Sequence, residues 1–433
     1  MAPNQDRQAR CFRRLPDLKG DVQVEDVQLP WGIEREKILR SGIHESRMHI
    51  LWIPVVHGFV YRAQVTNRCG GVNLRRKIMV SAHTLIVEPD DGRTLVLQSI
   101  NAATKSIDLT IYELTDAQIM SALEAAQARK VTVRVLYNWY SFTARMQQTD
   151  ITPAIQKLTQ AGIQCKEAPS TFEVTHEKAI VIDGATAIVM SFNLVADYFG
   201  STRDFGIVTT VPAEVAEIDA VFQADWSGNA ITPKVASLVW SPVNSSAKLT
   251  SLVNSAQKTL DIYCEEAEDP GTLGAMVAAA KRGVTVRFIA AVLSEEGKVN
   301  GNARGVTTML KGGVNAVCKT FLYIHAKMIL ADYGTSIAQA YIGSENFSCV
   351  SLDKNRECGI IVTDSAILSR LNTTYTSDWA QPSVTVTPDN TPLTPCSGGT
   401  TASTKTRKKS GATAELKPTN TSAEIKANKA RRR

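Results

Sequence analysis

Two short stretches of the chain place a histidine and a lysine two residues apart, in front of an apolar run and an aspartate. They read His176-Glu-Lys178-Ala-Ile-Val-Ile-Asp183 and His325-Ala-Lys327-Met-Ile-Leu-Ala-Asp332. In an extended strand, residues two apart point to the same side. Each stretch is therefore expected to aim one imidazole and one ammonium at the same point, from the edge of a buried strand.

Each stretch is followed by a serine, an asparagine and then an acidic residue. In chain order these are Ser191, Asn193 and Asp204 in the first set, and Ser344, Asn346 and Glu357 in the second. The acid lies 28 residues after the first histidine and 32 residues after the second. The additional four residues of the second copy are already present before its serine, so the two sets keep one register.

Side chains of these types suit the cleavage of a phosphodiester. Lysine and asparagine donate hydrogen bonds to the non-bridging oxygens and stabilise the negative charge of the transition state. One imidazole can attack phosphorus while the other protonates the leaving oxygen. A carboxylate behind each imidazole would fix its tautomer and raise its basicity. The sequence shows no clustered set of metal ligands, so neither a metal nor another cofactor is expected.

Both stretches lie inside two copies of a longer repeat. SIDLTIYELT at 106–115 matches TLDIYCEEAE at 259–268, and VTVR follows in both copies. Residues 116–130 and 272–283, which lie between these segments, have apolar residues at helical spacing. The alternation of strand, helix and β-branched strand predicts an α/β unit with a largely parallel sheet in each copy.

The pattern HxKxxxxD followed by SxN, present twice, resembles the phospholipase D superfamily of HKD phosphodiesterases over about residues 85–381. This resemblance implies two duplicated α/β lobes related by a pseudo-two-fold axis, with mixed sheets flanked by helices. It also implies a covalent phosphohistidine intermediate that water or another alcohol resolves. The first copy has Met190 where the pattern and the second copy have glycine. We expect this longer side chain to narrow the first-copy side of the pocket.

The resemblance gives each motif residue a role by position. His176 and His325 would be the nucleophile and the general acid, and family precedent favours His176 as the nucleophile. Asp204 and Glu357 would orient the two imidazoles. The catalytic lysines would also bind the phosphate, together with the asparagines and the supporting serines: Lys178, Lys327, Asn193, Asn346, Ser191 and Ser344.

Four further acidic residues lie near the motifs. Asp183 and Asp332 give the motif its name, but they lie five residues beyond the lysines and are interpreted as stabilising the strand ends. Glu265 and Glu266 lie where a strand should open onto the site, where the first copy has Tyr112 and Glu113. They would contact the substrate, form an ion pair or cap a helix.

Composition divides the chain into four parts. Residues 1–79 are basic and lack sustained periodicity, so they are predicted to be a poorly structured extension before two domains at 80–240 and 241–383. Residues 384–433 are rich in Thr, Ser, Pro and Lys and are predicted to be a disordered basic tail. Because 1–79 and 401–433 carry +6 and +8 of a net charge of +6, the middle of the chain is acidic. The overall charge therefore does not identify a partner.

The leading hypothesis is a phospholipase D-type enzyme that hydrolyses or transfers the phosphatidyl group of a glycerophospholipid at a membrane surface. The alternatives are a metal-independent nuclease of the same superfamily and a non-catalytic anion-binding protein. The acidic body and the lack of a nucleic-acid-binding module disfavour the nuclease, and the intact sets of side chains disfavour the scaffold. A synthase joining two phospholipids usually brings membrane-spanning segments, and no apolar run of about 18 residues occurs.

Other features set expectations about assembly, location and cysteines. Both motifs lie in one chain, so a monomer is expected to suffice for a complete site. No signal peptide is recognised at the N-terminus, which favours a cytoplasmic or peripheral membrane location. The 8 cysteines show no close spacing, so we expect neither a zinc site nor a disulfide framework.

Overall fold

The structure is a computed structural model. It describes residues 48–55, 58–65, 81–138, 151–293 and 300–396. The chain divides into two compact units, and the second unit holds both copies of the repeat.

In the first unit, strands β1 (Met48–Val55) and β2 (Gly58–Val65) pair in a two-stranded sheet. The sequence did not predict this sheet. The rest of the predicted N-terminal extension, and the tail beyond residue 396, lie outside the described residues.

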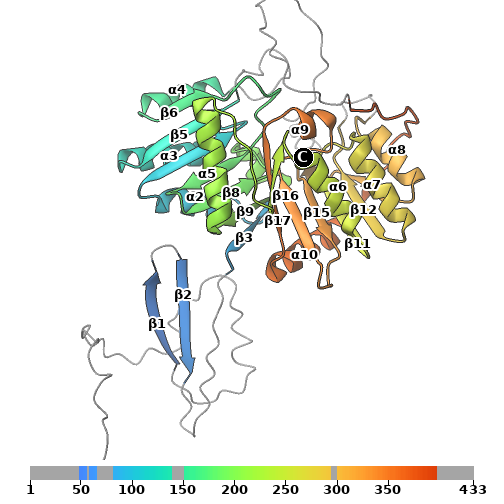
Figure 1. Cartoon of the computed structure of the whole chain (residues 1–433), viewed down its shortest axis with the longest axis horizontal. Coiled ribbons are helices and arrows are strands. Elements are labelled where there is room, and N and C mark those ends of the chain that lie inside the picture. The colour runs from blue at the N-terminus through green and yellow to red at the C-terminus, as the bar shows by residue number, and fades with distance from the viewer. Residues whose placement is uncertain (1–47, 56–57, 66–80, 139–150, 294–299, 397–433) are drawn as a thin grey trace, which may run out of the picture. The chain divides into compact units, whose positions relative to one another are not determined.

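The first copy of the repeat forms a sheet flanked by helices (Figure 1). Its elements are β3 (His83–Glu88), α2 (Thr94–Ala102), β4 (Ser106–Ile111), α3 (Ala117–Ala128), β5 (Thr132–Tyr137), α4 (Thr152–Gln160), β6 (Gln164–Glu167), β7 (Ala179–Ile182), β8 (Thr186–Met190), the 3₁₀ turn η3 (Ala196–Phe199), β9 (Thr202–Thr209) and α5 (Pro212–Ser227). β4, β5 and β6 are parallel, whereas β7, β8 and β9 follow in antiparallel order, and β3 pairs with the far side of β9. The sheet is therefore mixed, and the expectation of a largely parallel sheet is wrong.

The second copy repeats this arrangement. Its elements are β10 (Leu238–Ser241), α6 (Ser245–Ser255), β11 (Thr259–Cys264), α7 (Pro270–Lys281), β12 (Thr285–Ala290), α8 (Ala303–Lys311), β13 (Asn315–Lys319), β14 (Tyr323–Ile324), β15 (Met328–Ala331), β16 (Gln339–Gly343), α9 (Cys349–Asp353), β17 (Glu357–Val362), α10 (Ser365–Trp379) and β18 (Ser383–Val384). The sheet order is β10-β17-β16-β15-β11-β12-β13-β18, with β11, β12 and β13 parallel. In Figure 1 the first lobe, blue to green, lies beside the second, yellow to red.

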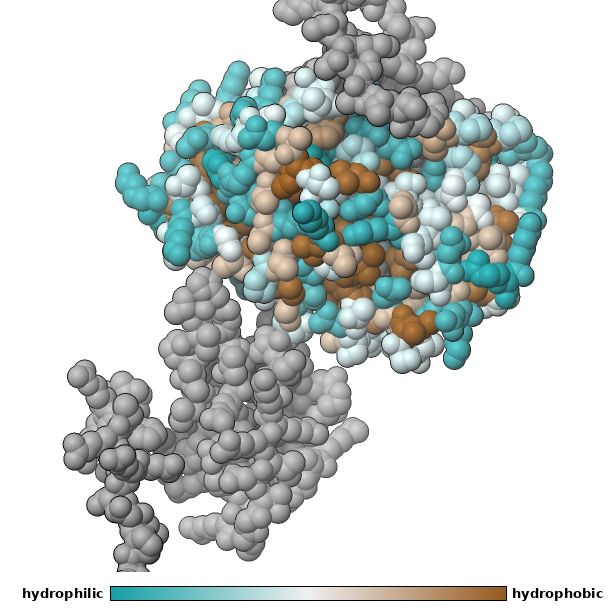
Figure 2. Space-filling view, in the orientation of Figure 1, coloured by the Kyte–Doolittle hydropathy of each residue, from teal (hydrophilic) through white to brown (hydrophobic). Residues whose placement is uncertain are grey.

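Both faces of the second sheet are buried, because successive residues of its strands face different clusters of the core. On β15, Met328 and Leu330 join a cluster that runs through the first lobe, whereas Ile329 and Ala331 join a cluster under the second lobe's own helices. This is the period-two alternation of an extended strand. On the face seen in Figure 2, hydrophilic residues dominate the outer edges of the lobes, and hydrophobic residues gather toward the middle.

The second histidine stretch lies where the chain crosses from one lobe to the other. β14, just before it, pairs in parallel with β9 of the first lobe. The backbone N–H groups of His325 and Ala326 donate to the carbonyl oxygen of Arg203 at 3.2 and 2.9 Å. Strand β15 of the second sheet begins only at Met328. The histidine and lysine therefore precede the strand rather than lying on it, because their backbone is still bound to the other lobe.

The first histidine stretch crosses in the same way. Thr175 forms a parallel bridge with Arg356 of the second lobe. The N–H groups of His176 and Glu177 both donate to the carbonyl oxygen of Arg356 at 2.9 Å. β7 begins at Ala179, after the lysine. The two crossings are reciprocal, so matching sets of backbone hydrogen bonds join the two lobes in a pseudo-two-fold arrangement.

The arginines at these crossings also bind carboxylates of the opposite lobe. Arg203 Nε lies 2.6 Å from Asp378 on α10, and Arg356 Nη2 donates to Asp225 on α5 at 2.9 Å. All four side chains are almost fully buried. Each aspartate directly precedes a tryptophan near the end of its helix, so the pairs occupy the same position in both copies. Two buried ion pairs therefore fasten each lobe to the other.

Replacing Arg203 by methionine should cost about 3–5 kcal/mol of unfolding free energy, because Asp378 would be left buried without a counter-charge. Urea unfolding measures this change. Lys157→Gln is the control, since its pair with Glu124 is 3.1 Å long but 54% exposed at the lysine and should contribute no more than about 1 kcal/mol. Equal effects of the two variants would contradict the importance of the buried pair.

A disulfide that the sequence did not predict joins the end of the described chain to the second lobe. Cys349, the first residue of α9, is bonded to Cys396, with their Cα atoms 5.4 Å apart. The remaining cysteines of the described residues are free, and three of these four are buried. Residues 384–396, predicted as part of a disordered tail, are therefore tied to α9.

The Cys396→Ser variant should lose up to about 4 kcal/mol of unfolding free energy, because the bond closes a loop with a sequence separation of 47 residues. Unfolding in urea with and without a reductant tests this. The reductant should destabilise the native chain and leave the variant unchanged. A native chain that does not respond to reductant would show that the bond contributes no stability.

Candidate active site

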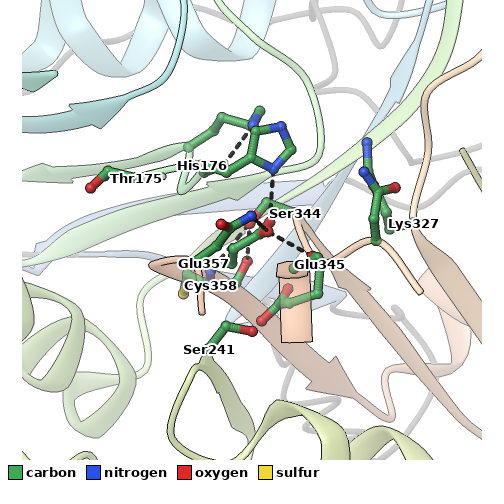
Figure 3. A network of polar contacts seen from close by, with 12 residues as sticks. Thr175, His176, Ser241, Lys327, Ser344, Glu345, Glu357 and Cys358 are labelled. Atoms are coloured by element: carbon green, nitrogen blue, oxygen red, sulfur yellow. Dashed lines mark hydrogen bonds and ion pairs between the residues drawn. The ribbon is translucent and has the colours of Figure 1, made fainter. Parts of the chain in front are cut away.

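The ring of His176 is held by a carboxylate of the other lobe. Its Nδ1 lies 2.8 Å from Oε2 of Glu357, the first residue of β17 (Figure 3). Tyr112 packs its ring edge-on against the imidazole, with centroids 4.9 Å apart. The His176 side chain is 14% exposed, whereas Glu357 is fully buried. Glu357 and Tyr112 thus orient the imidazole, and one side of the ring is open to solvent.

The ring of His325 is held in the same way from the first lobe. Its Nδ1 lies 2.8 Å from Oδ1 of Asp204 on β9. Tyr198 packs edge-on against it at a centroid distance of 4.7 Å. The His325 side chain is only 1% exposed. The second imidazole is therefore more deeply enclosed than the first.

Each acid thus orients the histidine of the opposite copy. Asp204 follows His176 in the sequence but binds His325, and Glu357 follows His325 but binds His176. A carboxylate on Nδ1 leaves Nε2 as the nitrogen that can attack or carry a proton. Neither half of the chain holds a complete set on its own.

Hydroxyl and amide groups fix the two acids. Asp204 accepts hydrogen bonds from Ser191 at 2.7 Å and Thr202 at 2.6 Å. Glu357 accepts from Ser351 at 2.6 Å and Asn355 at 2.9 Å. Burial alone would raise the pKa of Glu357, but His176, Lys178 and the Ser351 hydroxyl lower it below its ordinary value. The sequence did not identify Thr202, Ser351 or Asn355, because their role appears only in the hydrogen bonds that they donate to the two acids.

The predicted phosphate-binding serines point toward strands β9 and β17. Ser191 Oγ donates to Asp204 and accepts from the N–H of Phe205 at 2.9 Å. Ser344 Oγ accepts from the N–H of Cys358 at 3.2 Å. Both serines are fully buried. Their hydroxyls support the strands that carry the acids, and their direct contact with phosphate stays a prediction.

The two lysines are fully buried beside the histidines, but their surroundings differ. Each Nζ donates to the carbonyl oxygen of the histidine two residues earlier at 2.6 Å. Lys178 then lies over the ring of Tyr112, 5.2 Å from its centroid. Lys327 instead donates to Glu265 Oε2 at 2.8 Å. The predicted ion-pair interpretation of Glu265 therefore holds in the structure.

The two asparagines meet a glutamate that follows the first strand of their own copy. Asn193 accepts from the backbone N–H of Glu113 at 3.2 Å. Asn346 donates to Glu265 Oε2 at 3.3 Å. Histidine, lysine and asparagine of each copy thus gather near the carboxyl ends of β4 and β11.

Charge and burial set the protonation of the first lobe's groups. Burial and the nearby charge of Lys178 lower the pKa of His176 to about 4, despite the opposing effect of Glu357. Burial and the charge of Lys327 lower the pKa of Lys178 to about 7. In the second lobe, burial would lower the pKa of Lys327, but Glu265 raises it above its ordinary value. His176 is therefore a neutral base at pH 7, and Lys327 is a permanent cation.

Asp183 and Asp332 lie at tight turns after β7 and β15, both with positive φ angles, 55° and 52°. Asp183 accepts backbone N–H groups of the segment before β4, including that of Lys105 at 2.7 Å. Asp332 accepts those of the segment before β11, including that of Lys258 at 2.6 Å. Both aspartates hold strand ends and lie away from the histidines.

Two further expectations concern Met190 and metals. Met190 is fully buried in the apolar core, so the expectation that it narrows the pocket is wrong. Tyr341 and Glu345 occupy the corresponding space in the second copy, where a Cβ on Gly343 would lie 2.4 Å from the Tyr341 hydroxyl. Among the described residues, the potential metal ligands that cluster are Asp269 and the two disulfide-bonded cysteines.

Comparison with known proteins agrees with this fold and geometry. A family model described as "Cardiolipin synthase, PLD-like domain" matches residues 96–226 and 249–379. The chain is 23% identical over 320 residues to Minor cardiolipin synthase ClsB of Bacillus subtilis (strain 168), covering 65% of this chain and 77% of that protein. It is 25% identical over 330 residues to Cardiolipin synthase 1 of Staphylococcus aureus (strain COL), covering 66% of each.

A solved structure shares the fold. Phosphatidylserine synthase of Haemophilus influenzae Rd KW20 superposes with a TM-score of 0.54 at 14% identity, over 73% of this chain and 90% of that one. The chain belongs to the phospholipase D superfamily and carries two phospholipase D-like domains. The predicted family and the predicted pair of duplicated α/β lobes are both confirmed.

The rate of phosphodiester turnover, measured as kcat/KM against pH, should be bell-shaped. It should fall below about pH 4, where His176 becomes protonated, and above about pH 7, where Lys178 loses its charge. Lys178→Arg should move the alkaline limb to higher pH, because a guanidinium stays charged. An alkaline limb that is unchanged in this variant would show that another group causes it.

Proposed function

We propose that the chain is a phosphatidyltransferase of the phospholipase D type, which moves the phosphatidyl group of a glycerophospholipid to an alcohol through a phosphohistidine intermediate. Water competes with the alcohol as acceptor. The observation that carries the proposal is the reciprocal placement of two His–carboxylate pairs, at 2.8 Å each, beside two buried lysines.

In the first step, Nε2 of His176 attacks phosphorus. The bond from phosphorus to the leaving alcohol breaks, and His325 gives the proton on its Nε2 to the leaving oxygen. Glu357 stabilises the positive charge that develops on His176. Lys178, Lys327 and the asparagines hold the non-bridging oxygens.

In the second step, His325 acts in the opposite direction. It takes the proton of the acceptor hydroxyl as that oxygen attacks phosphorus, and the bond between phosphorus and His176 breaks. Both imidazoles return to their starting states, so no other reactant is needed. An alcohol acceptor gives a new phosphatidyl ester, whereas water gives phosphatidic acid.

The names of the relatives support transfer over hydrolysis. Two curated relatives are named cardiolipin synthases, and a structural neighbour is named a phosphatidylserine synthase. This favours the synthase branch, which the sequence had ranked lower for want of membrane-spanning segments. Within the described part of the chain, no helix is both long enough and apolar enough to cross a membrane. We propose that the enzyme meets its lipid at the membrane surface, as a peripheral protein.

Vesicles of phosphatidylglycerol, incubated with the full chain in EDTA and with ethanol added, test the proposal. We expect phosphatidylethanol, together with cardiolipin when a second lipid is the acceptor. His176→Ala should reduce both by at least about 10⁴-fold, because the nucleophile is lost. A parallel incubation with single-stranded DNA tests the nuclease alternative.

His83→Gln is a matched control for the loss of a histidine. His83 lies outside the site, between Glu214 and Asp364, at 2.8 Å from each. This variant should keep its turnover. Phosphatidic acid without phosphatidylethanol would assign the chain to the hydrolases, and DNA cleavage without lipid turnover would assign it to the nucleases. Turnover that survives in His176→Ala would overturn the proposed mechanism.

A further inference from the structure

The two halves of the site differ most at the residue that follows their first strand. This residue is Tyr112 after β4 and Glu265 after β11, at equivalent positions of the repeat. Tyr112 presents an uncharged ring to His176 and Lys178. Glu265 presents a carboxylate to His325 and Lys327. The crossings, the acids, the lysines and the asparagines otherwise match in both copies.

Glu265 is fixed by contacts on both of its oxygens. Oε1 accepts the hydroxyl of Tyr323 at 2.7 Å. Oε2 accepts from Lys327 at 2.8 Å and Asn346 at 3.3 Å, and lies 3.6 Å from Nε2 of His325. The residue is 4% exposed. A buried carboxylate therefore lies among the donors that the second copy would offer to a phosphate.

This carboxylate opposes an attack on phosphorus by His325. A phosphodiester carries a negative charge, and two like charges a few ångströms apart in a buried site repel strongly. Glu265 also pairs with Lys327, so this lysine is already bound to a carboxylate of its own lobe. The more exposed ring of His176 is also the more accessible of the two.

The same carboxylate suits His325 to carry a proton. Its oxygen is 3.6 Å from Nε2, the nitrogen that Asp204 does not hold. A negative charge at this distance attracts the positive charge that the ring carries during proton transfer. The separation is too long for a direct hydrogen bond, but a hydroxyl oxygen at hydrogen-bond distance from each group could bridge the two. A leaving or accepting alcohol placed there would exchange its proton with His325.

We propose that the residue after the first strand of each lobe decides which histidine attacks phosphorus, and that Glu265 makes His325 the proton carrier and leaves His176 as the nucleophile. This inference rests on the proposed phosphohistidine chemistry. Glu265 acts through His325 and Lys327, so it is a positioning residue. Removing its charge should slow the first step when the leaving alcohol needs a proton, and hardly slow that step when the leaving group does not.

Two diesters separate these cases. Phosphatidylglycerol has a poor leaving group that needs an acid, whereas bis(4-nitrophenyl) phosphate releases a stable phenolate without one. Glu265→Gln should lose about 10²-fold or more in turnover of the lipid, because general acid catalysis contributes about 10²–10⁴-fold. It should lose less than about 3-fold in the initial burst of nitrophenolate, which reports the first step alone. Glu268→Gln, which removes an exposed carboxylate three residues further along the chain, is the matched control and should behave as the native chain with both. Thermal melting checks that the variants are folded.

Mapping the phosphorylated histidine gives a second, independent result. After a quench during turnover of the nitrophenyl diester, the label should lie on His176 in the native chain. In the double variant Tyr112→Glu/Glu265→Tyr, which exchanges the residues of the two lobes, it should move to His325. A label on His325 in the native chain, or one that stays on His176 in the double variant, would overturn the inference.

The outcomes also separate this inference from the proposed function. Labelling by the nitrophenyl diester without lipid turnover would reject the phospholipid substrate, while the position of the label would still decide which histidine attacks. Equal losses of Glu265→Gln on both diesters would show a merely structural role. Absence of any label with either diester would reject the phosphohistidine mechanism and this inference together.

Discussion

The site depends on one exchange between the lobes, made at two consecutive residues of β9 and again at the last residue before β17 and the first residue of that strand. The carbonyl oxygen of Arg203 binds the backbone of the second histidine stretch, and the next residue, Asp204, holds the ring of His325. Arg356 and Glu357 do the same for His176. Each arginine side chain also binds an aspartate of the opposite lobe. Because backbone, ring and side chain are fixed together, any relative shift of the lobes would disturb both imidazoles at once.

Burial determines which of the carboxylates near the two histidines carry a charge. The carboxylates close to the paired acids hold their protons: burial and the charge of Asp204 raise the pKa of Glu88 to about 9, and burial and the charge of Glu357 raise that of Glu345 to about 8. Glu357 stays charged, since His176, Lys178 and the hydroxyl of Ser351 lower its pKa against the effect of burial. The low dielectric thus leaves one negative charge behind His176, where the reaction needs it.

The sequence predicted what local patterns determine. Periodicity and the repeat predicted two α/β lobes, and the spacing of the motifs placed histidine, lysine and asparagine together. The sequence could not predict that each acid binds the histidine of the other lobe. Asp204 and Glu357 keep the same register in both copies, and spacing along the chain does not show which lobe an acid faces. The expectation of a largely parallel sheet was wrong because β7 and β8, although antiparallel, are as apolar as the strands of a parallel sheet. The Cys349–Cys396 bond joins residues with no spacing signal.

In a duplicated site, symmetry cannot assign different roles to the two histidines. Attack and protonation need one neutral and one protonated imidazole at the same moment. Two equivalent histidines would be equally suited to either role. The interactions that the repeat duplicates, including the acid on each Nδ1, act equally on both rings and cancel in the comparison. A difference must therefore come from a position where the copies diverge and where a charge meets a reacting nitrogen. Among the described residues that touch the two rings, Glu265 meets both conditions, since its counterpart Tyr112 carries no charge at neutral pH.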